Sequence, residues 1–201
     1  MRRTGVRLAA IAAAVFTAGA VPATAETTVL ESNCEIRLYT NGAVTPPFTV
    51  RGDFQLLGSL PATVGLHTPV VAEGFGVRVR LDWEVLGPEL AHRGVTRFAS
   101  GEVLSAHLSL YEDGVMDWPV NPFGSYGSFD VDQLRTGLTD TIEDKVLTTD
   151  ASVPGHWEYG SYEGEITLAF HKLDNPQTTM IAICTADQGQ DLSWADTVVT
   201  P

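Results

Sequence analysis

Cysteine is scarce in this chain of 201 residues, which contains only Cys34 and Cys184. Two thiols alone make a poor zinc site, and no histidine lies at ligand spacing from either of them. If the chain is exported to an oxidising compartment, a single disulfide between Cys34 and Cys184 is the natural interpretation. Two free thiols, or a bond between two molecules, are the alternatives.

Basic residues are also few. The sequence has 12 Lys and Arg side chains against 25 Asp and Glu side chains, which gives a formal net charge of −13 at pH 7. A chain this acidic repels phosphate backbones and anionic lipid, so nucleic acid is not an expected partner. Most of the carboxylates are expected to form a solvated surface.

Motifs that would identify a reaction, a metal or a cofactor are absent. There is no HExxH or other zinc pattern, and no two of the five histidines are paired at i,i+2 or i,i+4; they are His67, His92, His107, His156 and His171. The strings FGSYG and YGSYEG come nearest to the GxSxG turn of a serine hydrolase but lack its spacing. Asp130 and Asp132 alternate as calcium ligands do, without the third ligand and the glycine of a calcium loop. We therefore expect no catalytic residue, no metal site and no cofactor.

No hydrophobic run is long enough to suggest a membrane span. Three arginines within residues 1–7 precede an uncharged, alanine-rich run over 8–21. A transmembrane helix needs about 20 predominantly apolar residues, so this run is too short and too weakly apolar. Pro22 ends the run, and Ala23-Thr24-Ala25 supplies the small residues that a signal peptidase requires. The pattern predicts a secretory signal peptide that is cleaved after Ala25.

Cleavage would divide the chain into a signal peptide, residues 1–25, and a single mature domain, residues 26–201. The leader takes three arginines with it, which leaves 9 basic and 25 acidic side chains and a net charge of about −16. We expect the mature protein to be secreted, either free in the extracellular medium or associated with the cell envelope, with no membrane insertion after processing.

Most of the mature chain alternates apolar and polar residues with the period of a β-strand. The clearest strand is expected over 77–85, where Val, Leu and Trp alternate with charged residues, and the segments 34–38 and 48–57 show the same pattern. Turn signals at 112–114 and 173–177 predict two hairpins. Several short strands between turns are typical of an antiparallel β-sandwich, so we expect an all-β fold.

One stretch departs from the strand period. Its apolar residues recur at spacings of three and four, as on one face of a helix; they are Val131, Leu134, Leu138, Ile142 and Val146. Asp130 could cap such a helix, although Gly137 in its middle would cost about 1 kcal/mol relative to alanine. We expect one short helix near 130–146, with a long connection as the alternative.

The segment ICTADQGQDLSWADTVV resembles the closing segment of a family of secreted actinobacterial domains of unknown function, which end in a strand, Cys-Thr, a short Asp/Pro-Gly-Gln segment and a final strand. Other pieces follow in the family's order: SNCEIRLY as the opening strand, LPATVGLHTPVV as a loop, LAHRGVTRFASGE as a middle strand, and SVPGHWEYG before the last hairpin. The similarity covers roughly residues 34–199, although Gln188 stands where the family often has proline and the segment DWPVNPFGSYGSF is unusual for it. The resemblance implies a single immunoglobulin-like antiparallel β-sandwich with stapled terminal strands and a secreted location. It carries over no catalytic residue.

Aromatic residues are dense in two glycine-rich segments, 118–129 and 157–162. Tyr and Trp bury large areas with few rotatable bonds, which suits a shallow binding face for sugars or peptides. The candidate ligand-binding residues are Tyr126, Tyr159, Tyr162, Trp118 and Trp157. The three tyrosines have Gly or Ser neighbours, so we expect their rings to be open, whereas the two tryptophans could equally fill the core.

These features favour a secreted, non-enzymatic binding or structural protein whose partner is an envelope glycan or an extracellular protein. The alternatives belong to other classes. A glycoside hydrolase could use a carboxylate pair such as Glu163 and Glu165. A secreted inhibitor of another protein could make its contact through the loop at 117–128.

Overall fold

The structure is a computed structural model that describes residues 22–23, 28–112, 115–120, 125–142 and 145–201. Antiparallel strands make up most of this part of the chain, and the two helices within it are short. The expectation of an all-β fold is therefore confirmed. Among the described residues, no helix has the length and apolar character needed to cross a membrane.

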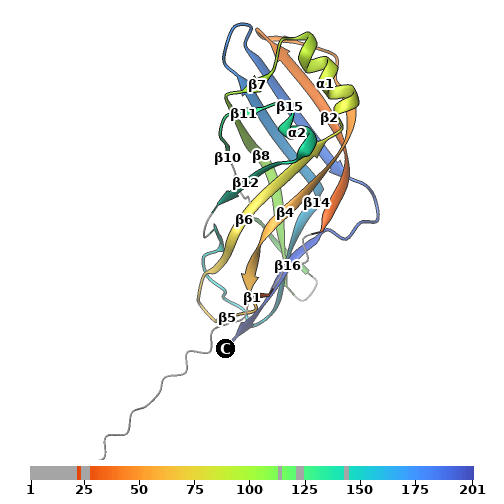
Figure 1. The fold of residues 1–201 in the computed structure, drawn as a ribbon. Coiled ribbons are helices and arrows are strands. Elements are labelled where there is room, and N and C mark those ends of the chain that lie inside the picture. Colours follow the sequence, from red (N-terminus) through yellow and green to blue (C-terminus); the bar gives the residue numbers. More distant parts are fainter. Residues whose placement is uncertain (1–21, 24–27, 113–114, 121–124, 143–144) are drawn as a thin grey trace, which may run out of the picture.

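The long strands form one continuous sheet. In spatial order they are β10 (Ser125–Tyr126), β8 (Ser100–Glu112), β14 (Gly155–Lys172), β15 (Thr178–Ala186), β2 (Val29–Thr40), β4 (Phe48–Pro61), β6 (Val70–Leu81) and β12 (Leu138–Ile142). They run along an elongated molecule, with helix α1 at one end and the C-terminus at the other (Figure 1). Both predicted hairpins are confirmed, because β8 pairs with the strand that follows 113–114 and β14 pairs with β15 across the turn at 173–177.

Shorter strands extend this sheet. They are β1 (Pro22–Ala23) beside β4, β3 (Ala43–Val44) beside β2, β9 (Val115–Val120) beside β8, β13 (Lys145–Thr148) beside β6, and β16 (Ser193–Thr200) between β14 and β5 (Thr63–Gly65). Strands β7 (Arg97–Phe98) and β11 (Phe129–Asp130) form a separate pair. The β16–β5 pairing is parallel, and the other described pairings are antiparallel. Strand β1 lies within the predicted signal peptide, so cleavage after Ala25 would remove it.

The sheet curls so that its two ends approach each other around one core. Tyr126, on β10 at one end of the strand order, donates a hydrogen bond from its hydroxyl to the carbonyl of Val77 on β6, near the other end, at 3.3 Å. Between these ends the rings of Phe98, Phe129 and Phe170 pack at centroid distances of 5.4 to 5.7 Å. Burying each such side chain contributes about 1.5 to 3 kcal/mol. The result is a sandwich-like fold whose two layers are halves of one sheet.

The predicted alternation holds through β2, β4 and β6. The side chains of Cys34, Ile36 and Leu38 are fully buried, and their neighbours on β2 face outward or are partly exposed. Cys34 lies directly opposite Cys184 on β15, and the two form the predicted disulfide. The bond joins the first long strand to the penultimate one, inside the core.

Helix α1 (Trp83–His92) corrects the expectation of a strand over 77–85. Strand β6 ends at Leu81, and the Asp82 carboxylate then accepts a hydrogen bond from the backbone N–H of Glu84 at 2.9 Å, which caps the helix. Leu86 and Leu90, four residues apart, bury one face of the helix. Val85, expected to point inward, is consequently 47 % exposed. The prediction of a middle strand over LAHRGVTRFASGE is also wrong in part, because the first residues of this segment belong to the end of α1.

A short helix does form near 130–146, as expected. It is α2 (Gln133–Thr136), a single turn whose Leu134 is buried. Gly137 ends it with a φ of 111°, a conformation that suits glycine. Of the other apolar residues in the series, Val131 lies in the turn before α2, and the last three lie on strands β12 and β13, which pair with β6.

Candidate binding groove

The candidate aromatic rings are buried wherever the structure describes them. Tyr126 is 4 % exposed, Tyr159 is 0 % exposed and Trp157 is 3 % exposed. The expectation that Gly and Ser neighbours would leave the tyrosine rings uncovered is therefore wrong for Tyr126 and Tyr159. The side chains of Trp118 and Tyr162 lie outside the described part of the structure, and they remain predicted contacts only.

Residues distant in sequence cover these rings. The ring of Tyr126 packs on Phe170 at a centroid distance of 6.0 Å, in the space left by Gly101, where an added Cβ would lie 3.2 Å from Tyr126. The hydroxyls of Tyr159 and Thr148 lie 2.9 Å apart in a hydrogen bond. Burial raises the pKa of Tyr159 to about 12, because the charged phenolate would lose its hydration. These rings support the core.

The carboxylate pair considered for hydrolysis is only partly described. Glu165 lies exposed on β14, opposite Thr185 of β15, and the side chain of Glu163 is outside the described residues. Within the described part of the chain, no group of three or more His, Cys, Asp or Glu side chains is placed to hold a metal ion.

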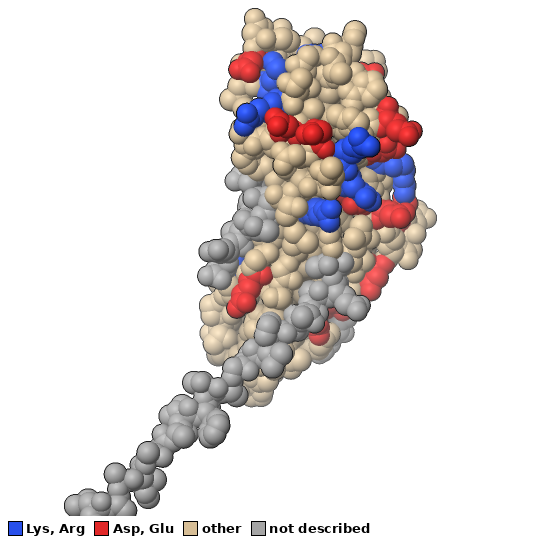
Figure 2. All heavy atoms as spheres, in the orientation of Figure 1, with Lys and Arg blue, Asp and Glu red and all other residues tan. Residues whose placement is uncertain are grey.

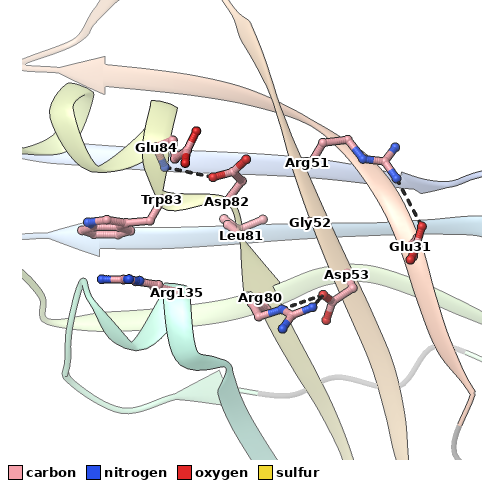
Figure 3. A pocket seen from close by; sticks show the side chains of 10 residues that line it. All are labelled: Glu31, Arg51, Gly52, Asp53, Arg80, Leu81, Asp82, Trp83, Glu84 and Arg135. Atoms are coloured by element: carbon pink, nitrogen blue, oxygen red, sulfur yellow. Dashed lines mark hydrogen bonds and ion pairs between the residues drawn. The ribbon is translucent and has the colours of Figure 1, made fainter.

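A groove of about 620 Å³ lies instead where β2, β4 and β6 meet the two helices. We call it the Trp83 groove. Its lining has four acidic side chains, Glu31, Asp53, Asp82 and Glu84, and three arginines, Arg51, Arg80 and Arg135; Gly52, Leu81 and Trp83 complete it. Figure 3 shows Trp83 and Arg135 together at one end, with Arg51 and Glu31 at the other. In Figure 2 the charged residues of this face gather in the half of the molecule that carries α1 and α2.

The register of β2, β4 and β6 brings three of the charged residues of the groove side by side. Asp53 of β4 lies opposite Glu31 of β2 on one side and Arg80 of β6 on the other, so these three residues form a row on the outer face. The neighbouring row faces inward and contains Gly52. A Cβ added to Gly52 would lie 2.7 Å from the Arg80 carbonyl and 3.1 Å from the Cys34 sulfur, so glycine allows the close approach of β4 to β6 above the disulfide.

Two of the arginines are already held by carboxylates. Arg51 donates two hydrogen bonds to Asp187, at 3.0 and 2.8 Å, and Asn33 donates a third at 2.9 Å. The hydrogen bonds from Arg51 hold the pKa of Asp187 below its usual value and raise that of Arg51. Arg80 donates to Asp53 at 2.7 Å. Fixed, paired groups of this kind offer hydrogen-bond donors and acceptors with little net charge.

Trp83 is the large apolar side chain of the groove. It is the first residue of α1 and is partly buried against the core. A Cβ added to Gly87, one turn later, would lie 2.5 Å from the indole Nε1, so the ring rests on the helix surface where Gly87 has no side chain. The absence of a side chain at Gly87 thus positions the ring of Trp83.

Arg135 and Glu84 are the groove's free charged groups. Among the described residues, neither side chain has an ion pair or hydrogen bond, whereas Arg51, Arg80, Asp53 and Asp82 each have one. A guanidinium beside an indole and a nearby carboxylate can therefore make new hydrogen bonds without first breaking existing ones.

Sequence reasoning missed Trp83 because the alternation over 77–85 assigned its ring to the core. The available signal was Asp82, a good helix cap, followed by apolar Leu86 and Leu90 at helical spacing. Comparison with family models, with curated proteins and with solved structures finds no match to the chain. The resemblance to secreted actinobacterial domains therefore stays a prediction.

Proposed function

We propose that this protein is a secreted, non-enzymatic binding protein that holds an uncharged glycan in the Trp83 groove. The observation that carries the proposal is the ring of Trp83, positioned on Gly87 in a groove whose charged side chains are mostly paired with one another. A pyranose has the complementary surface, with C–H groups on one face and hydroxyls around its edge. The indole offers an apolar platform to that face.

The paired charges suit hydroxyls better than ions. The Arg80–Asp53 and Arg51–Asp187 pairs present carboxylate acceptors and guanidinium donors whose charges largely cancel. A charged ligand would have to compete with these existing partners, whereas a hydroxyl can donate to the carboxylate and accept from the arginine at once.

A peptide fits the groove less well. Peptide recognition relies on apolar side chains seated in pockets, and the apolar residues of this lining are Trp83 and Leu81, of which Leu81 is only 1 % exposed. The net charge of −13 also disfavours strongly anionic polymers.

Export supports an external ligand. The disulfide fits an extracellular protein, and the basic and apolar leader with its Ala-Thr-Ala site predicts release of a chain that begins at Glu26. The resemblance to secreted actinobacterial domains favours the same location. Intact mass of the exported protein tests this step, and retention of residues 1–25 would contradict it.

Binding is tested by calorimetry with soluble hexaoses of four glycan types, namely cello-, xylo-, manno- and N-acetylchito-oligosaccharides. We expect at least one hexaose to bind with a micromolar to millimolar Kd, and Trp83→Ala to weaken it at least tenfold, since one aromatic contact of this kind contributes about 1 to 2 kcal/mol.

Tyr39→Ala is the matched control. Tyr39 is a partly exposed aromatic residue that lines a separate hollow beside Asn41 and Gln177, so its removal should leave the affinity unchanged. Absence of binding by all four hexaoses, or equal loss in both variants, would contradict the proposal. Release of new reducing ends from a bound hexaose would show a hydrolase instead.

A further inference from the structure

A second hollow, of about 500 Å³, adjoins the Trp83 groove. Trp83 lines both hollows, and Gly87, Ala91 and Thr96 line the second one with it. No other residue is shared between the two linings. The indole therefore stands at the border between two concave surfaces.

Helix α1 connects the two hollows. Trp83, Gly87 and Ala91 are spaced four residues apart, so they follow one another along a single face of the helix. The indole covers Gly87, and beyond it the small side chain of Ala91 leaves this face of the helix low. A ligand that stacks on Trp83 can continue along the helix without meeting a bulky side chain.

Polar groups border the far side of the second hollow. Arg97 donates a hydrogen bond to the hydroxyl of Ser128 at 2.9 Å and lies 4.0 Å from the carboxylate of Asp130. The second hollow thus repeats the character of the first, with an apolar floor along α1 and a paired arginine and carboxylate at its edge.

We propose that the ligand is a linear chain of sugar units that crosses Trp83 and occupies both hollows, with the indole under a central unit. This inference rests on the proposed glycan binding. It adds that the site recognises a stretch of polymer, since a single unit or a chain end on Trp83 would leave one of the two hollows unused.

The consequence is a dependence of affinity on chain length. Units that fill the second hollow add contacts to those in the Trp83 groove, so the hexaose should bind at least tenfold more tightly than the disaccharide of the same series. Affinity should rise with each added unit and then level off when both hollows are filled.

The experiment measures Kd for the two- to six-unit members of whichever of the four series binds. Ala91→Trp is the informative variant, because Ala91 is exposed on α1 and a large side chain there fills the second hollow. We expect it to lower hexaose affinity to that of the disaccharide while leaving the disaccharide unchanged. His92→Trp, at an exposed position that lines neither hollow, is the matched control and should behave as the wild type.

Each outcome is decisive. If no hexaose binds, both the glycan proposal and this extension are overturned. If the hexaose and the disaccharide bind equally, glycan binding stands and the two-hollow site is overturned. If affinity rises with length but Ala91→Trp has no effect, the second hollow is excluded as the place where the added units lie.

Discussion

Reduction of the disulfide should remove a large part of the stability of this domain. The Cys34–Cys184 bond closes a loop with a sequence separation of 150 residues. In the chain-entropy model, a cross-link of this span lowers the entropy of the unfolded chain enough to contribute about 5 kcal/mol. Domains of this size are stable by about 5 to 15 kcal/mol, so the loss is a substantial fraction of the total.

The assay compares urea unfolding of the oxidised protein with that of protein reduced in denaturant and refolded in reductant. This pair differs only in the bond, since both sulfurs are retained. We expect the free energy of unfolding to fall by about 3 to 5 kcal/mol and Tm to fall by about 6 to 20 °C. The double variant Cys34→Ala, Cys184→Ala should lose slightly more, because both side chains are buried.

A difference below about 1 kcal/mol between oxidised and reduced protein would show that the bond contributes little to stability. It would mean that the unfolded chain keeps β2 and β15 together without the bond. The denaturant slope would then be the same for the oxidised and the reduced protein, whereas a bond that compacts the unfolded chain lowers the slope on oxidation.

Three further changes have defined outcomes. Gly52→Ala places a Cβ 2.7 Å from the Arg80 carbonyl and should destabilise the fold by about 1 to 3 kcal/mol in urea, whereas Gly127→Ala, with open space around it, should be neutral. Burial raises the pKa of Tyr159 to about 12, so its contribution to folding stability is complete below pH 10, and about 2 to 3 kcal/mol of that stability is lost as pH rises towards 12. Tyr159→Phe should remove this alkaline loss of stability, and an unchanged loss in the variant would show that Tyr159 is not its source. Because the pKa of Asp187 is lowered, its ionised form contributes stability that is present above about pH 4 and lost as pH falls below it. Asp187→Asn should therefore make the free energy of unfolding depend less on pH in acid, and an unaltered pH dependence would argue against the Arg51 contact.

The strands could be predicted from the sequence because a half-buried strand repeats every two residues. Segments 34–38 and 48–57 keep that period over their length, and the structure places their apolar residues inside. Helix α1 could not be found in the same way, since the alternation continues past Leu81 through Trp83 and Val85. A single residue, Asp82, changes the backbone from strand to helix there.

The site was harder to predict than the fold. Tyr126 and Tyr159 have small neighbours along the chain, but residues of other strands cover them. The residues next to them in the sequence do not indicate those contacts. The Trp83 groove assembles from β2, β4, β6 and both helices, so it depends on strand register and on where β6 ends. The disulfide was predictable because only one intramolecular pair of cysteines exists.

The most direct test of glycan recognition by Trp83 is an NMR titration that follows the indole N–H resonances of the four tryptophans as a binding hexaose is added. Trp83→Phe identifies the resonance of Trp83. We expect this resonance to shift in a saturable way, while those of Trp157 and Trp194, which are 3 % and 4 % exposed, stay in place. A saturable shift at either buried indole with none at Trp83 would contradict glycan recognition by Trp83.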